Sequence, residues 1–271
     1  MELSGNTILI TGGGSGIGFA LASRLAKAGS KVIIVGRNVS KLEAAREKCP
    51  ELIVKGCDIS DPEERKALFA WATAEYPEIN MVINNAGIQR KINLSLEDND
   101  FSKVQEEINT NLEAPIHLSM LFAPYFVKHG GTIVNVSSRL GIMPAVWVPI
   151  YTTTKTGIHF FTRSLRMQLR KTGVKVVEIL PPMVDTDLAG PGQQKNGVNV
   201  DEFADGVIAK LASDVEEIGY ANSELALKDE YTFSVAMAEA EKFWGIFSNN
   251  NSQGKYHSRR KEKTTAQLSW L

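Results

Sequence analysis

The stretch that decides the fold is ILITGGGSGIG, residues 8–18. An apolar run with strand character leads directly into a glycine-rich turn, and the spacing after the turn predicts a helix. In this context Gly12 allows the tight turn, Gly16 lets the backbone approach a pyrophosphate, and Gly18 lets the helix pack on the sheet. The first amides of the helix and the Ser15 hydroxyl would face that phosphate. The spacing departs from the G-x-G-x-x-G fingerprint, so a turn that only caps a helix is the alternative.

The rest of the chain repeats this alternation of strand and helix. Strand character occurs at residues 6–11, 31–36, 52–56, 80–84, 131–137, 174–180 and 216–220. Helical spacing occurs at residues 18–29, 40–48, 61–76 and 150–173. Parallel strands need crossover helices, and strands this continuously apolar are covered on both faces. The pattern therefore predicts an α/β protein, a Rossmann-type doubly wound parallel sheet of about seven strands in a single domain.

Composition indicates how the chain is divided. Its 271 residues are 43% hydrophobic and 23% charged, which is typical of a globular protein. No linker or repeat divides residues 1–222, which we interpret as one domain. Residues 223–248 have the spacing of an amphipathic helical extension, and the polar, basic residues 249–271 predict a disordered tail.

Charge and cysteine usage limit the partners. A net charge of −1 gives no electrostatic footprint for nucleic acid or an anionic membrane. The first residues lack the pattern of a signal peptide and no stretch reaches 18 apolar residues, so we expect neither export by a signal peptide nor a membrane span. Cys49 and Cys57 make no disulfide framework and lack zinc-ligand spacing, which predicts a reducing cytoplasm and no metal. The run RRKEK at 259–263 is a candidate for nucleic-acid binding or localisation, with a solvated terminus as the alternative.

The end of the second predicted strand bears on the coenzyme. A site selective for NAD would carry an acidic residue there, whereas this chain has Gly36 and Arg37. A guanidinium pairs with a 2′-phosphate, so NADP(H) is favoured over NAD(H). An exposed charge flanking a helix is the alternative for Arg37. The stretch INNAG, 83–87, ends a strand in the crevice where such sheets bind ligands, or simply closes a turn.

A second constellation suggests proton transfer. Lys155 lies one helical turn after Tyr151, and Ser138 ends the preceding strand. A positive charge about 4 Å from a phenol would lower its pKa by about three units, which brings it toward neutrality. Ser138 would donate to a substrate oxygen, and hydride transfer to a carbonyl needs such a proton donor. The alternative is a chance pair, with a half-buried tyrosine and a solvated lysine.

The loop between the serine and the tyrosine bears on the substrate. Met143, Val146 and Trp147 predict an apolar pocket, unless Trp147 only packs the loop. Arg90 and Arg139 are candidates for contact with an acidic group, with exposed charges as the alternative.

Together these motifs resemble the short-chain dehydrogenase/reductase family. In the order and spacing of that family stand TGGGSGIG (11–18), CDIS (57–60), NNAG (84–87), INTNLEA (108–114), VNVSS (134–138), YTTTK (151–155) and ILPPMVDTDL (179–188). The chain is most similar to the DltE-like bacterial oxidoreductase branch. Where the family usually has Pro-Gly, this chain has Pro181-Pro182, as that branch does.

The resemblance implies the roles of individual residues. It implies that the catalytic set is Asn111, Ser138, Tyr151 and Lys155. It implies coenzyme contacts from Gly12, Ser15, Gly16, Ile17, Gly18, Arg37, Asp58 at the adenine, Asn85, Ala86 and Gly87 at the adenosine ribose, Tyr151, Lys155, and Pro181, Val184 and Thr186 at the nicotinamide. Asn111 would position a water that passes protons from the lysine, although its sequence context alone predicts a surface residue. Apolar helices at 103–128 and 150–170 imply a homodimer or homotetramer.

The prediction is an NADP(H)-dependent oxidoreductase that acts on a small-molecule carbonyl or secondary alcohol. A sugar-nucleotide epimerase or dehydratase can share a tyrosine-lysine pair, but the glycine spacing and the lack of a larger substrate-binding region disfavour it. A non-enzymatic nicotinamide-sensing protein is the other alternative. It would have no need of the four polar catalytic positions, which this chain retains.

Overall fold

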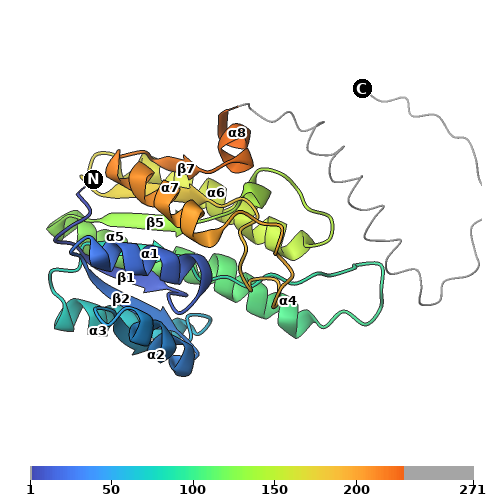
Figure 1. The fold of residues 1–271 in the computed structure, drawn as a ribbon, viewed down its shortest axis with the longest axis horizontal. Coiled ribbons are helices and arrows are strands. Elements are labelled where there is room, and N and C mark those ends of the chain that lie inside the picture. The colour runs from blue at the N-terminus through green and yellow to red at the C-terminus, as the bar shows by residue number, and fades with distance from the viewer. Residues whose placement is uncertain (1, 229–271) are drawn as a thin grey trace, which may run out of the picture.

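A computed structural model describes residues 2–228, which build one seven-stranded sheet in the order β3-β2-β1-β4-β5-β6-β7. Every pair of neighbouring strands is parallel. The strands are β1 Thr7–Thr11, β2 Lys31–Gly36, β3 Ile53–Gly56, β4 Met81–Asn84, β5 Thr132–Val136, β6 Lys175–Leu180 and β7 Glu217–Gly219. In Figure 1 the labelled strands run from β2 near the bottom to β7 near the top.

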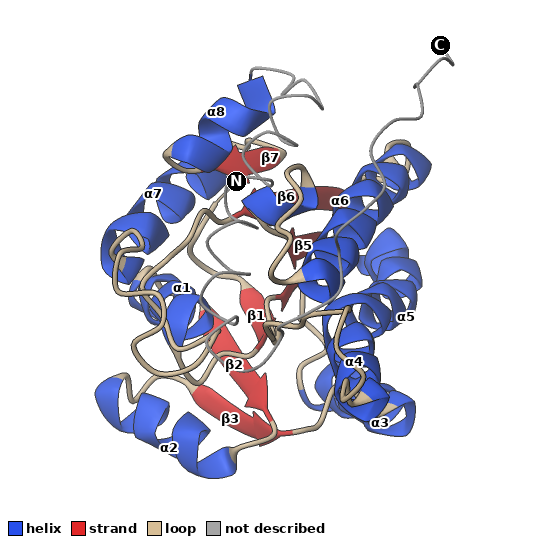
Figure 2. Ribbon diagram, turned by 90° about the vertical axis from the view of Figure 1, so that its right-hand side faces the viewer, coloured by secondary structure: helices blue, strands red, loops and turns tan. Residues whose placement is uncertain are grey.

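Helices cover both faces of this sheet. They are α1 Gly16–Lys27, α2 Val39–Lys48, α3 Pro62–Glu75, α4 Phe101–Ile108, α5 Ala114–His129, α6 Pro149–Leu169, α7 Val200–Ala212 and α8 Asn222–Lys228. Figure 2 shows α1, α2 and α7 on one side of the strands and α3, α4, α5 and α6 on the other. The predicted class, a doubly wound α/β sheet, is confirmed.

The alternation of side chains along β1 explains why both faces need cover. Ile8 and Ile10 belong to the hydrophobic cluster under α1 and α7, whereas Leu9 belongs to the cluster under α3 and α5. Successive residues of a strand point to opposite faces, so an apolar run produces two cores.

The order of the strands places the site. Strands β2 and β3 lie on one side of β1, and β4 to β7 lie on the other. The order of the strands therefore reverses between β1 and β4, which leaves a crevice at the carboxyl ends of these two strands. Asn85, which follows β4, connects the two sides of this crevice through hydrogen bonds to Thr11 at the end of β1. Its Nδ2 donates to the Thr11 carbonyl at 2.9 Å and its backbone N–H to Thr11 Oγ1 at 3.0 Å. The glycine turn after β1 and the segment after β4 are therefore held side by side.

One detail differs from the sequence expectation. A π-helical segment, Asn109–Glu113, joins α4 to α5 within a stretch expected to be regular helix. The predicted extension at 223–248 begins inside α8, where Ser223 is buried and its hydroxyl donates to the Leu180 carbonyl at 2.6 Å. The rest of that extension and the predicted tail lie outside the described residues. Within residues 2–228 no helix is both long and apolar enough to span a membrane.

Candidate active site

The glycine turn has the geometry that a dinucleotide cradle needs. Gly12 and Gly16 adopt positive φ values of 67° and 52°, which glycine reaches without strain. A Cβ on Gly12 would lie 2.8 Å from Ala86 Cα, and a Cβ on Gly18 would lie 2.3 Å from the Gly12 carbonyl oxygen. Ser15, the N-cap residue of α1, makes no side-chain capping bond, so its hydroxyl is available to a ligand. The residues present therefore fit a pyrophosphate at the start of α1.

The loop after β6 closes the crevice from the other side. Thr186 lies opposite the glycine turn, because its Cγ2 is 3.3 Å from the place where Gly16 would carry a Cβ. Val184 is buried in the core, and the Pro181 carbonyl accepts the Arg139 backbone N–H at 2.9 Å. The structure thus brings together the residues predicted to contact the pyrophosphate and those predicted to contact the nicotinamide. Ile17, by contrast, packs against the hydrophobic core.

The corner at the end of β2 holds Arg37 and Asp58. The Cys57 N–H donates to the Gly36 carbonyl at 3.1 Å, which keeps the two segments adjacent. Asp58 Oδ1 accepts from the backbone and the hydroxyl of Ser60 at 2.9 and 2.8 Å. Arg37 does not stand alone, since its Nη1 contacts Glu106 Oε1 of α4 at 2.7 Å.

Ser138, Tyr151 and Lys155 meet at the carboxyl end of β5, and all three are buried. The side chains of Tyr151 and Ser138 lie close enough for the serine to affect the pKa of the phenol. Ser138 Oγ also accepts the Leu140 N–H at 3.1 Å, which fixes the start of a short 3₁₀ turn, Arg139–Gly141. Lys155 Nζ donates to the Val136 carbonyl at 2.8 Å and lies 5.5 Å from the centroid of the Tyr151 ring. The lysine is therefore held beneath the tyrosine and is not solvated.

The expected lowering of the Tyr151 pKa is wrong. Burial raises the pKa of Tyr151, the Ser138 hydrogen bond offsets only part of that, and the Glu107 carboxylate raises it further. Burial also lowers the pKa of Lys155 to about 8, against the opposing effect of Glu178 and Glu107. The sequence argument counted the charge of the lysine and left out the cost of removing a phenolate from water.

Asn111 lies in the π-helical segment and is buried, contrary to the surface position that its context predicts. Its Oδ1 accepts the Ile88 N–H at 2.7 Å, and its Nδ2 donates to the Ile88 carbonyl at 2.7 Å and to Thr154 Oγ1 at 3.3 Å. A Cβ on Gly87 would lie 3.4 Å from Asn111 Oδ1 and 3.7 Å from Lys155 Nζ. Asn111 and Lys155 therefore face the same small space beside Gly87.

Buried acids near the site were missed by sequence reasoning. Glu107, one turn before Asn111, has an Oε1 without a hydrogen-bond partner among the described residues, and burial raises its pKa to about 7. Glu178 of β6 is buried and lies 2.9 Å from His159 Nδ1. The only available signal was position: Glu107 and Asn111 are four residues apart on one helical stretch.

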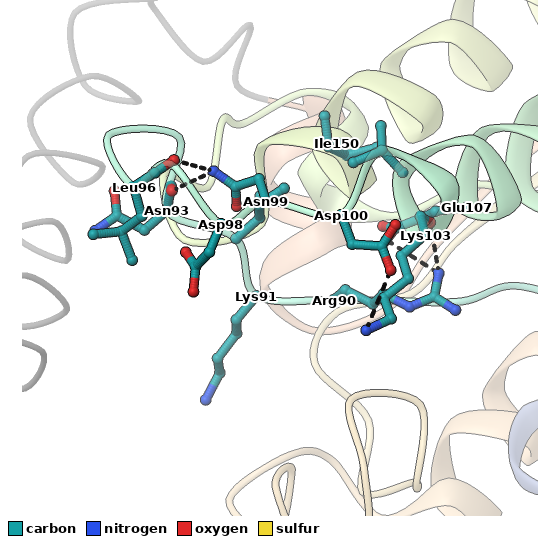
Figure 3. A pocket seen from close by; sticks show the side chains of 12 residues that line it. Arg90, Lys91, Asn93, Leu96, Asp98, Asn99, Asp100, Lys103, Glu107 and Ile150 are labelled. Carbon is teal, nitrogen blue, oxygen red and sulfur yellow. Dashed lines mark hydrogen bonds and ion pairs between the residues drawn. The ribbon is translucent and has the colours of Figure 1, made fainter.

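Glu107 also borders a pocket of about 410 Å³. Figure 3 shows its carboxyl group beside Arg90, with Ile150 on the wall of the same pocket. Arg90 Nη1 lies 3.9 Å from Glu107 Oε2. Because Ile150 directly precedes Tyr151, the pocket adjoins the start of α6.

The loop predicted to form an apolar pocket does contact the tyrosine. Trp147 and Leu188 pack against a small cluster made by Ala145, Val148 and Tyr151. Met143 is buried, and its sulfur lies 3.5 Å from Arg139 Nη1, so that arginine faces the loop. Leu188 comes from the loop after β6, and its place here could not be derived from sequence spacing.

This fold and site define a class: NAD(P)-dependent oxidoreductases with a single doubly wound domain. The short chain dehydrogenase family profile matches residues 6–197. The chain belongs to the short-chain dehydrogenase/reductase family.

Known proteins agree with this assignment. A protein of Bacillus subtilis (strain 168) named uncharacterized oxidoreductase DltE is 43% identical over 199 residues, which are 73% of this chain and 79% of that protein. This confirms the resemblance to the DltE-like branch. A short chain dehydrogenase from Burkholderia cenocepacia J2315, solved in complex with NADP, has a TM-score of 0.77 at 25% identity and covers 89% of this chain and 99% of its own. A metagenomic short-chain oxidoreductase in complex with NADP has a TM-score of 0.70 at 27% identity, with coverages of 81% and 98%.

Proposed function

We propose that this protein is an NADP(H)-dependent oxidoreductase that transfers a hydride between nicotinamide and a carbonyl or secondary alcohol. The observation that carries the proposal is the shared burial of Ser138, Tyr151 and Lys155 beside the crevice, with the lysine Nζ held 5.5 Å from the centroid of the Tyr151 ring. Arg37 and the NADP complexes of the two solved relatives support the choice of coenzyme.

When bound, the coenzyme supplies or accepts the hydride, and the chain handles the proton. In the reductive direction Tyr151 donates its phenolic proton to the oxygen of the substrate, and Ser138 orients that oxygen through its hydroxyl. The raised pKa of Tyr151 keeps the phenol protonated at neutral pH, which is the form that reduction needs. Oxidation of an alcohol needs the phenolate, so alkaline pH should favour it.

Lys155 and Asn111 serve the return of the proton. The ammonium group of Lys155 lies under the phenol, and Asn111 Oδ1 faces the same space beside Gly87. A water held there by Asn111 would pass a proton to the lysine, as the family resemblance implies.

The free thiols of Cys49 and Cys57, both buried, support a reducing cytoplasmic compartment.

A spectrophotometric screen tests the proposal. NADPH consumption is followed with a panel of ketones, aldehydes and quinones, using the unmodified protein and the Tyr151→Phe variant. Turnover of at least one substrate, lost in the variant, is expected. If both proteins bind NADPH equally and neither consumes it with any compound, a non-enzymatic nicotinamide-binding protein becomes the better description.

A further inference from the structure

The guanidinium of Arg37 is shared with an acidic residue from a distant part of the chain. Glu106 of α4 places Oε1 2.7 Å from Arg37 Nη1, and its other oxygen accepts from Arg90 Nη2. Both arginines lower the pKa of Glu106, Arg37 most of all, so it is a carboxylate at neutral pH. One carboxylate therefore bridges the end of β2 and the segment after β4.

This bridge lies at the corner where the protein would discriminate NADP(H) from NAD(H). Gly36 leaves the end of β2 without the acidic side chain expected of an NAD site. Glu106 supplies a carboxylate to the same corner from α4, next to the guanidinium that a 2′-phosphate would need. A phosphate and a carboxylate repel each other there, whereas a ribose 2′-hydroxyl can donate a hydrogen bond to the carboxylate.

The ion pair is exposed enough for Arg37 to leave Glu106 and bind a phosphate. The side chains of Arg37 and Glu106 are 54% and 33% exposed, and ion pairs at such positions contribute little stability. If Arg37 turns to a phosphate, Glu106 keeps its bond to Arg90 and is not left as an unpaired charge. The contact therefore does not prevent NADP(H) from binding, but it weakens the binding of the 2′-phosphate to Arg37.

We propose that Glu106 is a specificity-determining residue: its carboxylate competes with the 2′-phosphate of the coenzyme for Arg37 and so narrows the preference for NADP(H) over NAD(H). This inference rests on the proposed function, in which Arg37 binds the 2′-phosphate.

The test measures equilibrium binding rather than turnover. Dissociation constants for NADPH, NADH and the fragment 2′,5′-ADP are measured by calorimetry or fluorescence with the unmodified protein, Glu106→Gln and Glu106→Ala. Both variants should bind NADPH and 2′,5′-ADP more tightly, by about tenfold, because a like charge a few ångströms away is removed. NADH affinity should stay the same or fall. Two variants are used so that the result does not depend on the folding of one.

Two controls separate the explanations. Glu63→Gln makes the same change of net charge at an α3 surface pair, Glu63–Lys66, and should leave all three constants unchanged. Arg37→Ala should weaken NADPH and 2′,5′-ADP but not NADH. If Arg37→Ala has this effect and neither Glu106 variant changes the ratio of NADPH to NADH affinity, the competition is refuted while the proposed function stands. If the unmodified protein binds neither coenzyme, the proposed function fails and the inference fails with it.

Discussion

At the scale of single residues, a substitution of Tyr151 distinguishes the two candidate functions, an enzyme and a non-enzymatic binding protein. Replacing Tyr151 by Phe removes one oxygen and its interaction with Ser138, which should cost no more than about 1 kcal/mol of stability. Turnover should fall by about 10²–10⁴-fold, the usual contribution of a general acid. NADPH affinity, measured by fluorescence titration, should change little.

Lys155→Ala is the matched comparison. Lys155 lies beneath the phenol and, as the family resemblance implies, also contacts the coenzyme, so its loss should damage both coenzyme affinity and turnover. A Tyr151→Phe protein with full carbonyl-reducing activity would show that the tyrosine-lysine spacing is coincidental.

Glu107 should leave a signature in the pH dependence of stability. Burial raises the pKa of this carboxyl from 4.5 to about 7, so the folded protein holds a proton that the unfolded chain has already released. The free energy of unfolding should therefore decrease as pH rises from about 4.5 to about 7, and the loss should be complete above that range. Glu107→Gln cannot ionise, so its stability relative to the unmodified protein should increase across this window.

Urea unfolding at several pH values measures the effect. Glu63→Gln, a change at an exposed carboxylate, is the control and should follow the unmodified protein. Parallel curves for the unmodified protein and Glu107→Gln would mean that Glu107 titrates as an ordinary surface acid.

At the scale of elements, the turn between β1 and α1 depends on the absence of a side chain at Gly18. A Cβ there would meet the Gly12 carbonyl oxygen at 2.3 Å and Asn85 Nδ2 at 2.4 Å, and neither can move without opening the crevice. Gly18→Ala should destabilise the protein by about 1–3 kcal/mol and weaken NADPH binding. Thermal unfolding and titration measure the two effects.

Gly36→Ala is the control for stability, since its Cβ would meet Leu42 at an ordinary contact distance of 3.5 Å. Equal stability of the two alanine variants would contradict the prediction that the turn has no room for a Cβ at residue 18.

The same elements show what a sequence can and cannot predict. The strands and the glycine turn could be predicted, because short runs of apolar, β-branched residues and the turn residues that bound them are local features of the sequence. The burial of Asn111 could not, since the π-helical segment that carries it depends on how α5 packs on the sheet and α4 packs on α6. The pairing of Arg37 with Glu106 spans 69 residues and follows only from the order of the strands.

At the scale of the whole molecule, α5 and α6 carry large apolar side chains on the surface. Met120 and Val127 of α5 are 65% and 44% exposed, and Phe160 and Met167 of α6 are 60% and 73% exposed. Each pair is seven residues apart, which places both members on one stripe of their helix. Figure 2 shows these helices on the same side of the sheet. Such exposure on two helices of one layer is typical of a surface that another subunit covers.

We therefore expect a homodimer or homotetramer in solution. Phe160→Glu and Met167→Glu would bring a carboxylate into the contact and should shift the protein toward the monomer, because burying an unpaired charge is costly. Light scattering coupled to size exclusion at micromolar concentration measures the change. Leu94→Glu is the control: its side chain is 65% exposed but lies in the loop before α4, so it should leave the assembly intact. A monomeric unmodified protein would contradict the expectation, and the two stripes would then be exposed surface without a subunit partner.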